Sequence, residues 1–555
     1  MIFQTRSLSS LSKVFGKAEL EDKPYRKGTA LRGENFSFQI AYKSEKFLKN
    51  IVLSCSSQLN KYTEIREVKL RPATYLSCEF DENVLSKEPG LFPDFLFPCN
   101  GSLKAVNNSW RSVWFTVRLP ENVCPGKYKF DITFDRKSDK ENDTEFVVKE
   151  SFELEILDCV LPEQKLIHTE WFHVDCIALL HDVEIWSELH WKLLYEYMKN
   201  AADHGVNMLL TPIFTPPVDT QVGHERPTVQ LLDIVLKNGK YSFGFDKLER
   251  WLDMAAKCGI KYFEMPHFFT QWGAQKTPKI IAVKNGEKCR IFGWDVEAES
   301  TEYNNFLEAL LSCLCDFLAQ KGVLKNVYFH VSDEPEEKDQ KQYSTASSLL
   351  RKHLNEHKII DCLSDISFYE RGLVEIPVPS IGEIEPFMKT NLKERWCYYC
   401  CGPSTKTTNR FLHFPSQRTR ILGMQLYKYG MDGFLHWGYN FWFKQYSMGK
   451  INPFEDCTAG ENFPAGDPFV VYPGNTGPLD SLRWEVLFEA MQDLRALQLL
   501  EKLIGRKATI ALLEKGIDSI TMTDYPKSLQ WLLDCRENIN HKIQASIFEE
   551  TYALN

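Results

Sequence analysis

The sequence of 555 residues has no apolar run that approaches the ~20 residues needed to cross a bilayer. Its first residues, MIFQTRSLSSLSKVFGKAEL, lack the unbroken apolar segment of a secretory signal. Basic residues form no stripe, and the net charge of −9 is mild and spread along the chain. We therefore expect no membrane span and no nucleic-acid partner.

The sixteen cysteines show none of the spacing of a disulfide framework. Such scattered cysteines are typical of reduced thiols, and together with the missing signal they predict a cytoplasmic protein, or a secreted one if a signal has been removed. Cys397 and Cys400 form a CxxC pair, but no second Cys/His pair follows at the spacing of a zinc site. We therefore predict no metal site, and we interpret these cysteines as small residues on a buried strand.

Residues 1–160 are rich in short alternating segments, among them NFSFQIAY, SVWFTVRL, YKFDITF and FVVKESFELEIL. Polar turns such as ENVCPGKY and DRKSDKENDT separate them. Alternation over strand lengths between such turns predicts an antiparallel β-sandwich. VLPEQK, at 160–165, is the predicted domain boundary.

From residue 165 to about 505 the pattern changes to strand and helix in repetition. Eight strand candidates lie at 166–176, 207–217, 261–272, 326–335, 359–367, 374–380, 395–403 and 432–442. We predict an α/β fold with a (β/α)8 barrel, because eight parallel strands can close and leave no free edge. An open, doubly wound sheet is the alternative, but its usual Gly-rich turn after the first strand is missing. Residues 506–555, with strand-like ATIALL and SITMT and then a helix, are predicted to be a small extension packed on the barrel.

Two adjacent carboxylates stand where the fourth strand candidate ends, in NVYFHVSDEP. If Glu334 faces the barrel axis, alternation turns His330 and Tyr328 inward and Phe329 towards the helices. Asp333 and Glu334 would then lie at the mouth of the barrel, the face where enzymes with a (β/α)8 barrel have their active sites. The alternative is a structural role for both carboxylates at a helix N-terminus ahead of Pro335.

Adjacent carboxylates are poorly placed for two-carboxylate sugar hydrolysis, because a retaining pair is separated by ~5 Å across the scissile bond and an inverting pair by ~6.5–9.5 Å. They do fit a reaction in which the 2-acetamido oxygen of the substrate attacks the anomeric carbon. Glu334 would then serve as the general acid, and Asp333 would orient the acetamido N–H. Two carboxyls this close retain one proton more easily than an isolated carboxyl does.

Several longer strings, taken together and in order, resemble glycoside hydrolase family 123, the β-N-acetylgalactosaminidases, over residues 165–505. They are EWFHVDCIA, TPIFTPPVDT, HFFTQWGAQKTPKI, HVSDEP, YYCCGP, NRFLHFP, GFLHWGYNFW and VVYPGNTGPLDSLRWE. The resemblance implies a β-sandwich before the barrel, no cofactor, and retaining removal of a terminal β-linked N-acetylgalactosamine (GalNAc) through an oxazolinium intermediate. It assigns the orienting role to Asp333 and the acid/base role to Glu334. Family 20 hexosaminidases share this logic but match less well, because their pair follows a His-x-Gly-Gly sequence.

Further residues are candidates for substrate contacts, chiefly at strand ends. Trp437 is the expected floor of the sugar site, and Asn440 could bond a hydroxyl; either Tyr398 or Tyr399 could donate to the acetamido oxygen. The remaining candidates are His173 and Asp175, expected to hold each other, Asp219 and Thr220, His267, Gln271 and Trp272 at the start of a long aromatic loop, and His330, which is also interpretable as an interior histidine.

The expected substrate is a β-GalNAc-terminated oligosaccharide or a glycolipid headgroup, while the aglycone and the oligomeric state are left open. A second hypothesis is another barrel glycosidase that pairs Glu334 with a distant nucleophile such as Glu264 or Asp365. A third is a non-catalytic carbohydrate-binding protein.

Overall fold

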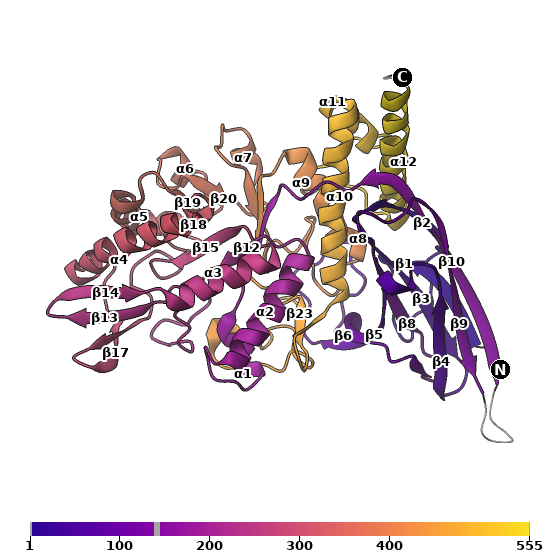
Figure 1. The fold of residues 1–555 in the computed structure, drawn as a ribbon, viewed down its shortest axis with the longest axis horizontal. Coiled ribbons are helices and arrows are strands. Elements are labelled where there is room, and N and C mark those ends of the chain that lie inside the picture. Colours follow the sequence, from indigo (N-terminus) through magenta and orange to yellow (C-terminus); the bar gives the residue numbers. More distant parts are fainter. Residues whose placement is uncertain (1–2, 138–144, 554–555) are drawn as a thin grey trace. The chain divides into compact units, whose positions relative to one another are not determined.

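The computed structural model describes residues 3–137 and 145–553, which form two compact units (Figure 1). The first consists of Met1–Lys165, Ser404–Tyr429 and Leu479–Asn555, and the second of Leu166–Pro403 and Gly430–Pro478. The first segment of unit one ends at Lys165. Residues 404–429 and 479–505, which the sequence analysis included in the barrel domain, group instead with the N-terminal segment. The units are described separately below.

The N-terminal segment of unit one forms two five-stranded sheets. In spatial order the first contains β1 (Phe3–Ser9), β3 (Asn35–Ser44), β8 (Arg111–Arg118), β5 (Thr63–Ala73) and β6 (Gly90–Pro98). The second contains β2 (Lys27–Arg32), β10 (Phe146–Val160), β9 (Gly126–Arg136), β4 (Leu48–Ser56) and β7 (Ser102–Ala105). Their strand pairs are antiparallel, as predicted, except that β2 runs parallel to β10.

Alternating apolar residues from both sheets meet in one core. Phe38 of β3 stacks on Phe115 of β8 and on Phe152 of β10, with ring centroids 4.7 and 4.2 Å apart. Phe38 and Phe115 are fully buried, and Phe152 is nearly so. Because successive side chains of a strand face opposite sides, this alternation produces a sandwich, and the sequence prediction is confirmed.

The rest of unit one is helical, with α8 (Ser416–Arg420), α9 (Leu422–Tyr429), α10 (Leu482–Ile504), α11 (Arg506–Leu513) and α12 (Leu529–Ala553). Helix α10 packs on the other four helices and on β6, and α12 also packs on β2 and β10. Buried ion pairs tie these helices together: Arg420 of α8 bonds Asp493 of α10 across 2.8 Å, and Arg536 of α12 bonds the same carboxylate across 2.8 Å. These contacts explain why residues 404–429 and 479–505 group with the sandwich.

The predicted strand at ATIALL is wrong, because residues 506–513 form helix α11. SITMT, at 519–523, does not form a strand either. The β-branched residues suggested strands, but Gly505 opens a new helix whose buried residues Thr509 and Leu513 lie on one face at helical spacing.

Unit two contains a near-closed parallel barrel whose eight strands all match predicted ones. They are β11 (Ile167–Glu170), β12 (Met208–Leu210), β15 (Tyr262–His267), β18 (Val327–His330), β19 (Lys358–Cys362), β20 (Ile376–Val378), β21 (Trp396–Tyr398) and β22 (Gly433–His436). Strands follow chain order around the barrel, and β22 returns to pair with β11. Between β20 and β21 the ladder reduces to a parallel bridge, in which Tyr398 N–H donates to Pro379 O across 3.0 Å. The prediction of a TIM-like α/β barrel is confirmed.

Helices of unit two are α1 (Val174–Leu180), α2 (Glu188–Asp203), α3 (Asp246–Cys258), α4 (Thr301–Gln320), α5 (Gln340–Leu354), α6 (Ser367–Glu370) and α7 (Glu385–Met388). Helix α4 shows how the sequence forms them. Its buried residues Leu307, Leu311, Leu314 and Leu318 repeat at helical spacing, and Ser300 caps its N-terminus by accepting from the Tyr303 N–H. The short strands β23 (Val471–Pro473) and β24 (Pro478–Asp480) follow the barrel in sequence.

Two hairpins extend from the loops after β12 and β15. They are β13 (Asp233–Lys237) with β14 (Lys240–Gly244), and β16 (Ile280–Lys284) with β17 (Glu287–Phe292), and β13 pairs with β16 to form a four-stranded sheet. The second region forms a hairpin where a long loop is predicted from the sequence. Each hairpin turns at an Asn-Gly pair with positive φ, Asn238-Gly239 and Asn285-Gly286, which is the usual sequence of a tight turn of this kind.

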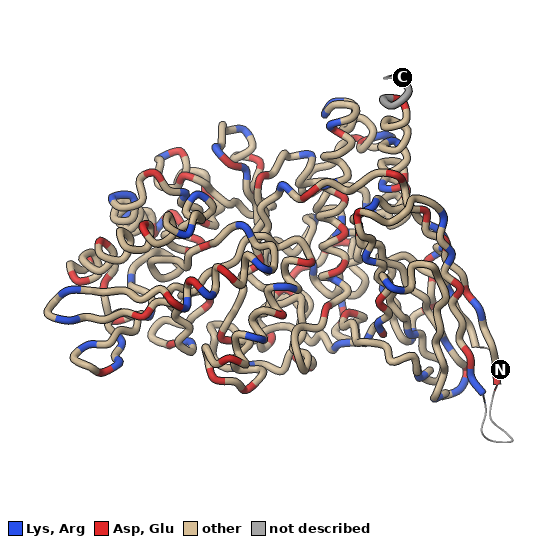
Figure 2. Tube along the Cα trace, viewed as in Figure 1, with Lys and Arg blue, Asp and Glu red and all other residues tan. Residues whose placement is uncertain are grey.

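Charges of both signs are interspersed along the chain in Figure 2. Within residues 3–137 and 145–553, no helix has the length and apolar character needed to cross a membrane.

Candidate active site

A cavity of about 230 Å³ opens at the carboxyl ends of the barrel strands. Residues in or after seven of the eight strands line it, all but β20: Trp171, His173, Val218, Asp219, Gln271, Trp272, Asp333, Glu334, Cys362, Tyr398, Cys400, Cys401, Leu435, Trp437, Gln445, Tyr446 and Phe463. A more open hollow of about 820 Å³ lies between α2 and α3 and is lined by residues of those two helices. Only the first is at the face where barrel enzymes have their chemistry.

Asp333 and Glu334 both line this cavity, just after β18. Tyr328 and His330 of β18 face the barrel interior, and Phe329 packs against Phe268 and His357 outside it, so the predicted strand phase is right. Beyond His330 the strand ends. Glu334 takes a left-handed backbone conformation with φ 43°, and its N–H donates to Cys362 O across 3.1 Å.

The two carboxylates have different surroundings. Oε1 of Glu334 accepts a hydrogen bond from the Tyr398 hydroxyl across 2.6 Å. The Asp333 carboxylate accepts no hydrogen bond from the residues that the structure describes, while its backbone oxygen accepts from the Trp272 N–H across 3.0 Å. Asp333 therefore presents a free carboxylate to the cavity, and Glu334 presents one that is held at one oxygen.

Burial and the neighbouring charge of Glu334 raise the pKa of Asp333 well above its usual range. Asp219, which lines the same cavity, adds to this, while the nearby His330 ring opposes it. Burial also raises the pKa of Asp219 to about 6. The carboxyls of Asp333 and Asp219 therefore keep a proton to higher pH than isolated carboxyls do. This agrees with the expectation that two adjacent carboxyls retain a proton more easily.

Four residues that line the cavity have positive φ without being glycine: Asp219 (40°), Trp272 (58°), Glu334 (43°) and Tyr446 (60°). Such conformations are costly for residues with a side chain and are concentrated at functional sites. Asp219 is fixed in place by bonds at both ends: its N–H donates to Gln271 Oε1 across 2.5 Å, and its Oδ2 accepts from the Tyr446 N–H across 2.8 Å.

Beneath the pair, His330 bridges two buried carboxylates. Its Nε2 bonds Glu264 Oε1 across 2.6 Å, and its Nδ1 bonds Asp361 Oδ1 across 3.1 Å. Burial works against a charged ring, but the bonds to Asp361 and Glu264 outweigh it and raise the pKa of His330 to about 9. His330 is thus a fully buried imidazolium at neutral pH, and both of its nitrogens are occupied by the protein rather than available to a ligand.

Glu264 is fully engaged in this network. Besides His330 it accepts from Thr169 Oγ1 and from Trp171 Nε1, each across 2.8 Å, and it is completely buried. Asp365 accepts from the Ser367 N–H across 2.9 Å at the start of α6. Neither lines the cavity, so neither is placed to act as the nucleophile of the second hypothesis.

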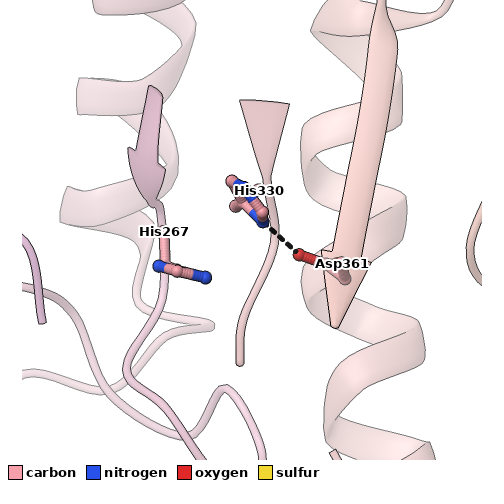
Figure 3. A group of neighbouring side chains, drawn as sticks. All are labelled: His267, His330 and Asp361. Carbon is pink, nitrogen blue, oxygen red and sulfur yellow. Dashed lines mark hydrogen bonds and ion pairs between the residues drawn. The ribbon is translucent and has the colours of Figure 1, made fainter. Parts of the chain in front are cut away.

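His267, His330 and Asp361 bring potential metal-ligand atoms within 4.8 Å of one another (Figure 3). His267 is fully buried, and both of its ring nitrogens lack a hydrogen-bond partner among the described residues. The donor atoms of His330 are already bonded to carboxylates, and Asp361 also accepts from Tyr343 and from the Val331 N–H. A metal would have to break these bonds, so we interpret the group as a hydrogen-bonded network with His267 packed beside it.

His173 and Asp175 were predicted to lie on the first strand and to bond each other, and both predictions are wrong. The two residues lie at the start of α1. Arg226 bonds both: its Nε and Nη2 donate to Asp175 across 2.9 and 2.8 Å, and its Nη2 lies 3.2 Å from His173 Nδ1. Burial and Arg226 lower the pKa of His173 to about 3, so its ring is neutral. His173 lines the cavity, while Asp175 lies behind it.

The other predicted contact residues also fall into two groups, those that line the cavity and those that are buried away from it. Asp219, Gln271, Trp272, Tyr398 and Trp437 line the cavity. Thr220, His267, His330, Tyr399 and Asn440 are buried and do not line it. The Asn440 amide bonds the backbone N–H and oxygen of His173, across 2.8 and 3.0 Å, which is a structural role. Trp437 Nε1 donates to Asp467 Oδ2 across 3.0 Å, which holds the indole as one wall.

Sequence reasoning missed several lining residues, notably Trp171, Tyr446, Cys400 and Cys401. Trp171 directly follows the first barrel strand, so its position after a strand end was a usable signal. Cys400 was expected on a buried strand, but β21 ends at Tyr398, and both Cys400 and Cys401 are half-buried at the cavity. Tyr446 lies in an irregular segment between β22 and β23, where no local pattern marks it.

Comparison with known proteins identifies the family of the chain. The family profile of the glycoside hydrolase 123 catalytic domain matches residues 171–500. A family 123 glycoside hydrolase from Clostridium perfringens, described in terms of glycolipid glycan hydrolysis, superposes with a TM-score of 0.71 at 17% identity, covering 100% of this chain and 99% of that one.

A family 5 mannosidase from Rhizomucor miehei has a TM-score of 0.31 at 13% identity, covering 60% of this chain and 93% of that one. This similarity is too low to support a conclusion about fold or function. No protein of curated function matches the sequence. The profile match spans more than half of the chain, so the protein belongs to glycoside hydrolase family 123 and is a glycoside hydrolase.

Proposed function

We propose that the protein is a retaining exo-β-N-acetylgalactosaminidase that removes terminal β-GalNAc from oligosaccharides or glycolipid headgroups. The observation that carries the proposal is that Asp333 and Glu334 are consecutive and both line one cavity, the first with a free carboxylate and the second held at one oxygen by Tyr398. The cavity is small, which suits a single terminal sugar rather than a chain.

In the proposed reaction the acetamido N–H of the sugar donates to the free carboxylate of Asp333. This bond favours the charged form of Asp333, and the acid role belongs to Glu334 in its protonated form. Glu334 then protonates the leaving oxygen while the acetamido oxygen attacks the anomeric carbon. In the second half Glu334 removes a proton from water, which opens the oxazolinium ring with overall retention.

Walls of the cavity suit this chemistry. Trp171 and Trp437 provide apolar faces for the C–H groups of a sugar ring, and both indoles are fixed, Trp171 by Glu264 and Trp437 by Asp467. Excluding water around the carboxylates strengthens their interaction with developing positive charge. The restriction to GalNAc, rather than another 2-acetamido sugar, rests on the family resemblance.

The test compares nitrophenyl β-glycosides of GalNAc, GlcNAc and galactose, with a GalNAc-derived thiazoline as a mimic of the intermediate. We expect turnover of the GalNAc glycoside and competitive inhibition by the thiazoline. Turnover of galactosides alone, without thiazoline inhibition, would contradict the proposal. Binding without any turnover would favour the carbohydrate-binding hypothesis.

A second candidate mechanism is supported by one observation, that Asp219 shares the cavity with Glu334. Asp219 in place of Glu264 or Asp365 would then be the nucleophile of an ordinary retaining enzyme. A fluorosugar that traps glycosyl esters distinguishes the two mechanisms: a labelled peptide containing Asp219 would establish the ester mechanism, whereas the substrate-assisted one leaves the protein unlabelled.

A further inference from the structure

Two aromatic side chains are exposed at the cavity. Trp272 is 41% exposed and Tyr446 38%, although both line the same cavity as the catalytic pair. Their rings meet edge to face, with centroids 5.8 Å apart and planes at 87°. Exposed aromatic pairs of this kind leave apolar faces in water and are typical of binding surfaces.

The backbone conformation and hydrogen bonds of Trp272 and Tyr446 fix the position of this pair. Both residues have left-handed backbones, with φ 58° for Trp272 and 60° for Tyr446. The Trp272 N–H donates to Asp333 O across 3.0 Å, and the Tyr446 N–H donates to Asp219 Oδ2 across 2.8 Å. Ser447 Oγ also donates to Asp219 O, across 2.7 Å. The backbones that carry the two rings are therefore bonded directly to the carboxylate-bearing residues of the site.

The size of the cavity decides what can lie against these rings. Its volume of about 230 Å³ is below the usual range for drug-sized ligands, roughly 300–1,000 Å³. One sugar unit fills such a space, so the next unit of a glycan must lie outside it, at the exposed edge. Trp272 and Tyr446 are the lining residues with large exposed apolar faces there.

The charge of the site constrains that next unit. Asp219, Asp333 and Glu334 line the cavity, and none of its lining residues is Lys or Arg. An anionic group beside the scissile bond would meet this negative field without a cation to pair with. An uncharged pyranose has apolar C–H faces that suit aromatic rings and brings no such penalty.

We propose that Trp272 and Tyr446 form a binding site for the aglycone, which accepts an uncharged pyranose on the leaving-group side of the scissile bond. The inference rests on the proposed function and specifies its substrate: glycans in which a neutral sugar carries the terminal GalNAc. A sugar stacked on one ring is flanked by the edge of the other. This arrangement aligns the glycosidic oxygen towards Glu334.

The test measures Trp272→Ala and Tyr446→Ala with two soluble probes and, for comparison, with a GalNAc-terminated glycolipid in phosphatidylcholine vesicles. The first is a free GalNAc-terminated oligosaccharide with a neutral second sugar. The second is the GalNAc-derived thiazoline, which fills only the inner site. We expect kcat/KM for the oligosaccharide to fall about tenfold in each variant, the size expected for one aromatic stacking contact. The thiazoline inhibition constant should change less than about twofold.

Conservative variants keep the test informative if an alanine variant folds poorly. Trp272→Phe and Tyr446→Phe retain an aromatic face and should recover most of the oligosaccharide activity. Phe47→Ala, at a residue that is 54% exposed in the sandwich, is the matched control and should leave both probes unchanged. A sialylated oligosaccharide, anionic at the second sugar, should be a poorer substrate for the wild type.

The outcomes separate the two proposals. If the wild type neither cleaves the oligosaccharide nor binds the thiazoline, the proposed function fails, and the aglycone site with it. If the wild type is active and the alanine variants match it on the free oligosaccharide, the aglycone site is wrong. A loss seen only with glycolipid in vesicles, and not with the free oligosaccharide, would assign the rings to a lipid contact and also overturn the inference.

Discussion

The hydroxyl of Tyr398 donates a hydrogen bond of 2.6 Å to Oε1 of Glu334. The two residues are 64 positions apart in sequence, one at the end of β21 and the other just after β18. Burial and the charge of Glu334 raise the pKa of Tyr398 well above its usual range, so the phenol stays protonated and acts as a donor. The bond holds one oxygen of Glu334 and leaves Oε2 to face the substrate.

Tyr398→Phe should therefore lower kcat/KM for nitrophenyl β-GalNAc roughly 10- to 100-fold, since a hydrogen bond to a charged group contributes about 1.5–3 kcal/mol. Tyr399→Phe is the matched control, because Tyr399 is buried and does not line the cavity. Its kcat/KM should stay within about twofold of the wild type. Equal losses in the two variants would show that Tyr398 acts only through packing.

Glu334→Gln should lose activity in proportion to how much the leaving group needs a proton. With a dinitrophenyl leaving group we expect a modest loss, and with an oligosaccharide a loss of about 10²–10⁴-fold, the usual contribution of general acid catalysis. Glu337→Gln, an exposed neighbour outside the cavity, is the control. A loss that is equal for good and poor leaving groups would rule out the acid role.

The dependence of kcat/KM on pH should report the ionisation of the Asp333 carboxyl. The proposed mechanism needs its carboxylate ionised, and its pKa is raised by burial and by Glu334. Activity should therefore fall with decreasing pH at a point above the usual range of an aspartate, instead of near pH 4. Asp333→Asn should slow formation of the intermediate and abolish this acid limb of kcat/KM. Unchanged turnover in that variant would refute the orienting role.

His330→Gln should destabilise the fold and shift the same acid limb. The raised pKa of His330, about 9, means that its charge stabilises the fold fully below about pH 6.5, the value of an unfolded histidine, and that this contribution is lost as pH rises through 9. Melting temperatures of wild type and variant should thus differ more at pH 6 than at pH 10.

Loss of that cation also removes a charge that opposes the raised pKa of Asp333, so the acid limb should move to higher pH. His541→Gln, in an exposed part of α12, is the control for both measurements. If the pH profile of His330→Gln matches the wild type while its stability falls, the network has a structural role only.

Local pattern predicted much of this architecture. The eight barrel strands are short apolar runs bounded by polar or Pro-containing segments, and each is recognisable alone. The alternation in NVYFHVSDEP placed Tyr328 and His330 inward and put Asp333-Glu334 at the strand end, because side-chain direction follows from the backbone within a few residues. The Asn-Gly turn at 285–286 carried an equally local signal that the loop interpretation overlooked.

Residues in irregular segments were beyond such reasoning. Asn440 and Trp437 are three positions apart, yet the first bonds the backbone of His173 and the second lines the cavity. Arg226, which binds His173 and Asp175, is more than fifty positions from both in sequence. Such pairings depend on how distant loops pack, which no short pattern encodes.

The sequence by itself determined the sandwich, the barrel and the acidic pair at the fourth strand end, because hydrophobic periodicity and strand phase are local properties of the chain. Only the tertiary structure decided which of Tyr398 and Tyr399 reaches Glu334, that Glu264 is consumed by a buried network around His330, and that Trp272 meets Tyr446 at the cavity edge. Each of these depends on the closure of the barrel and the packing of its loops, which bring together residues far apart in the chain.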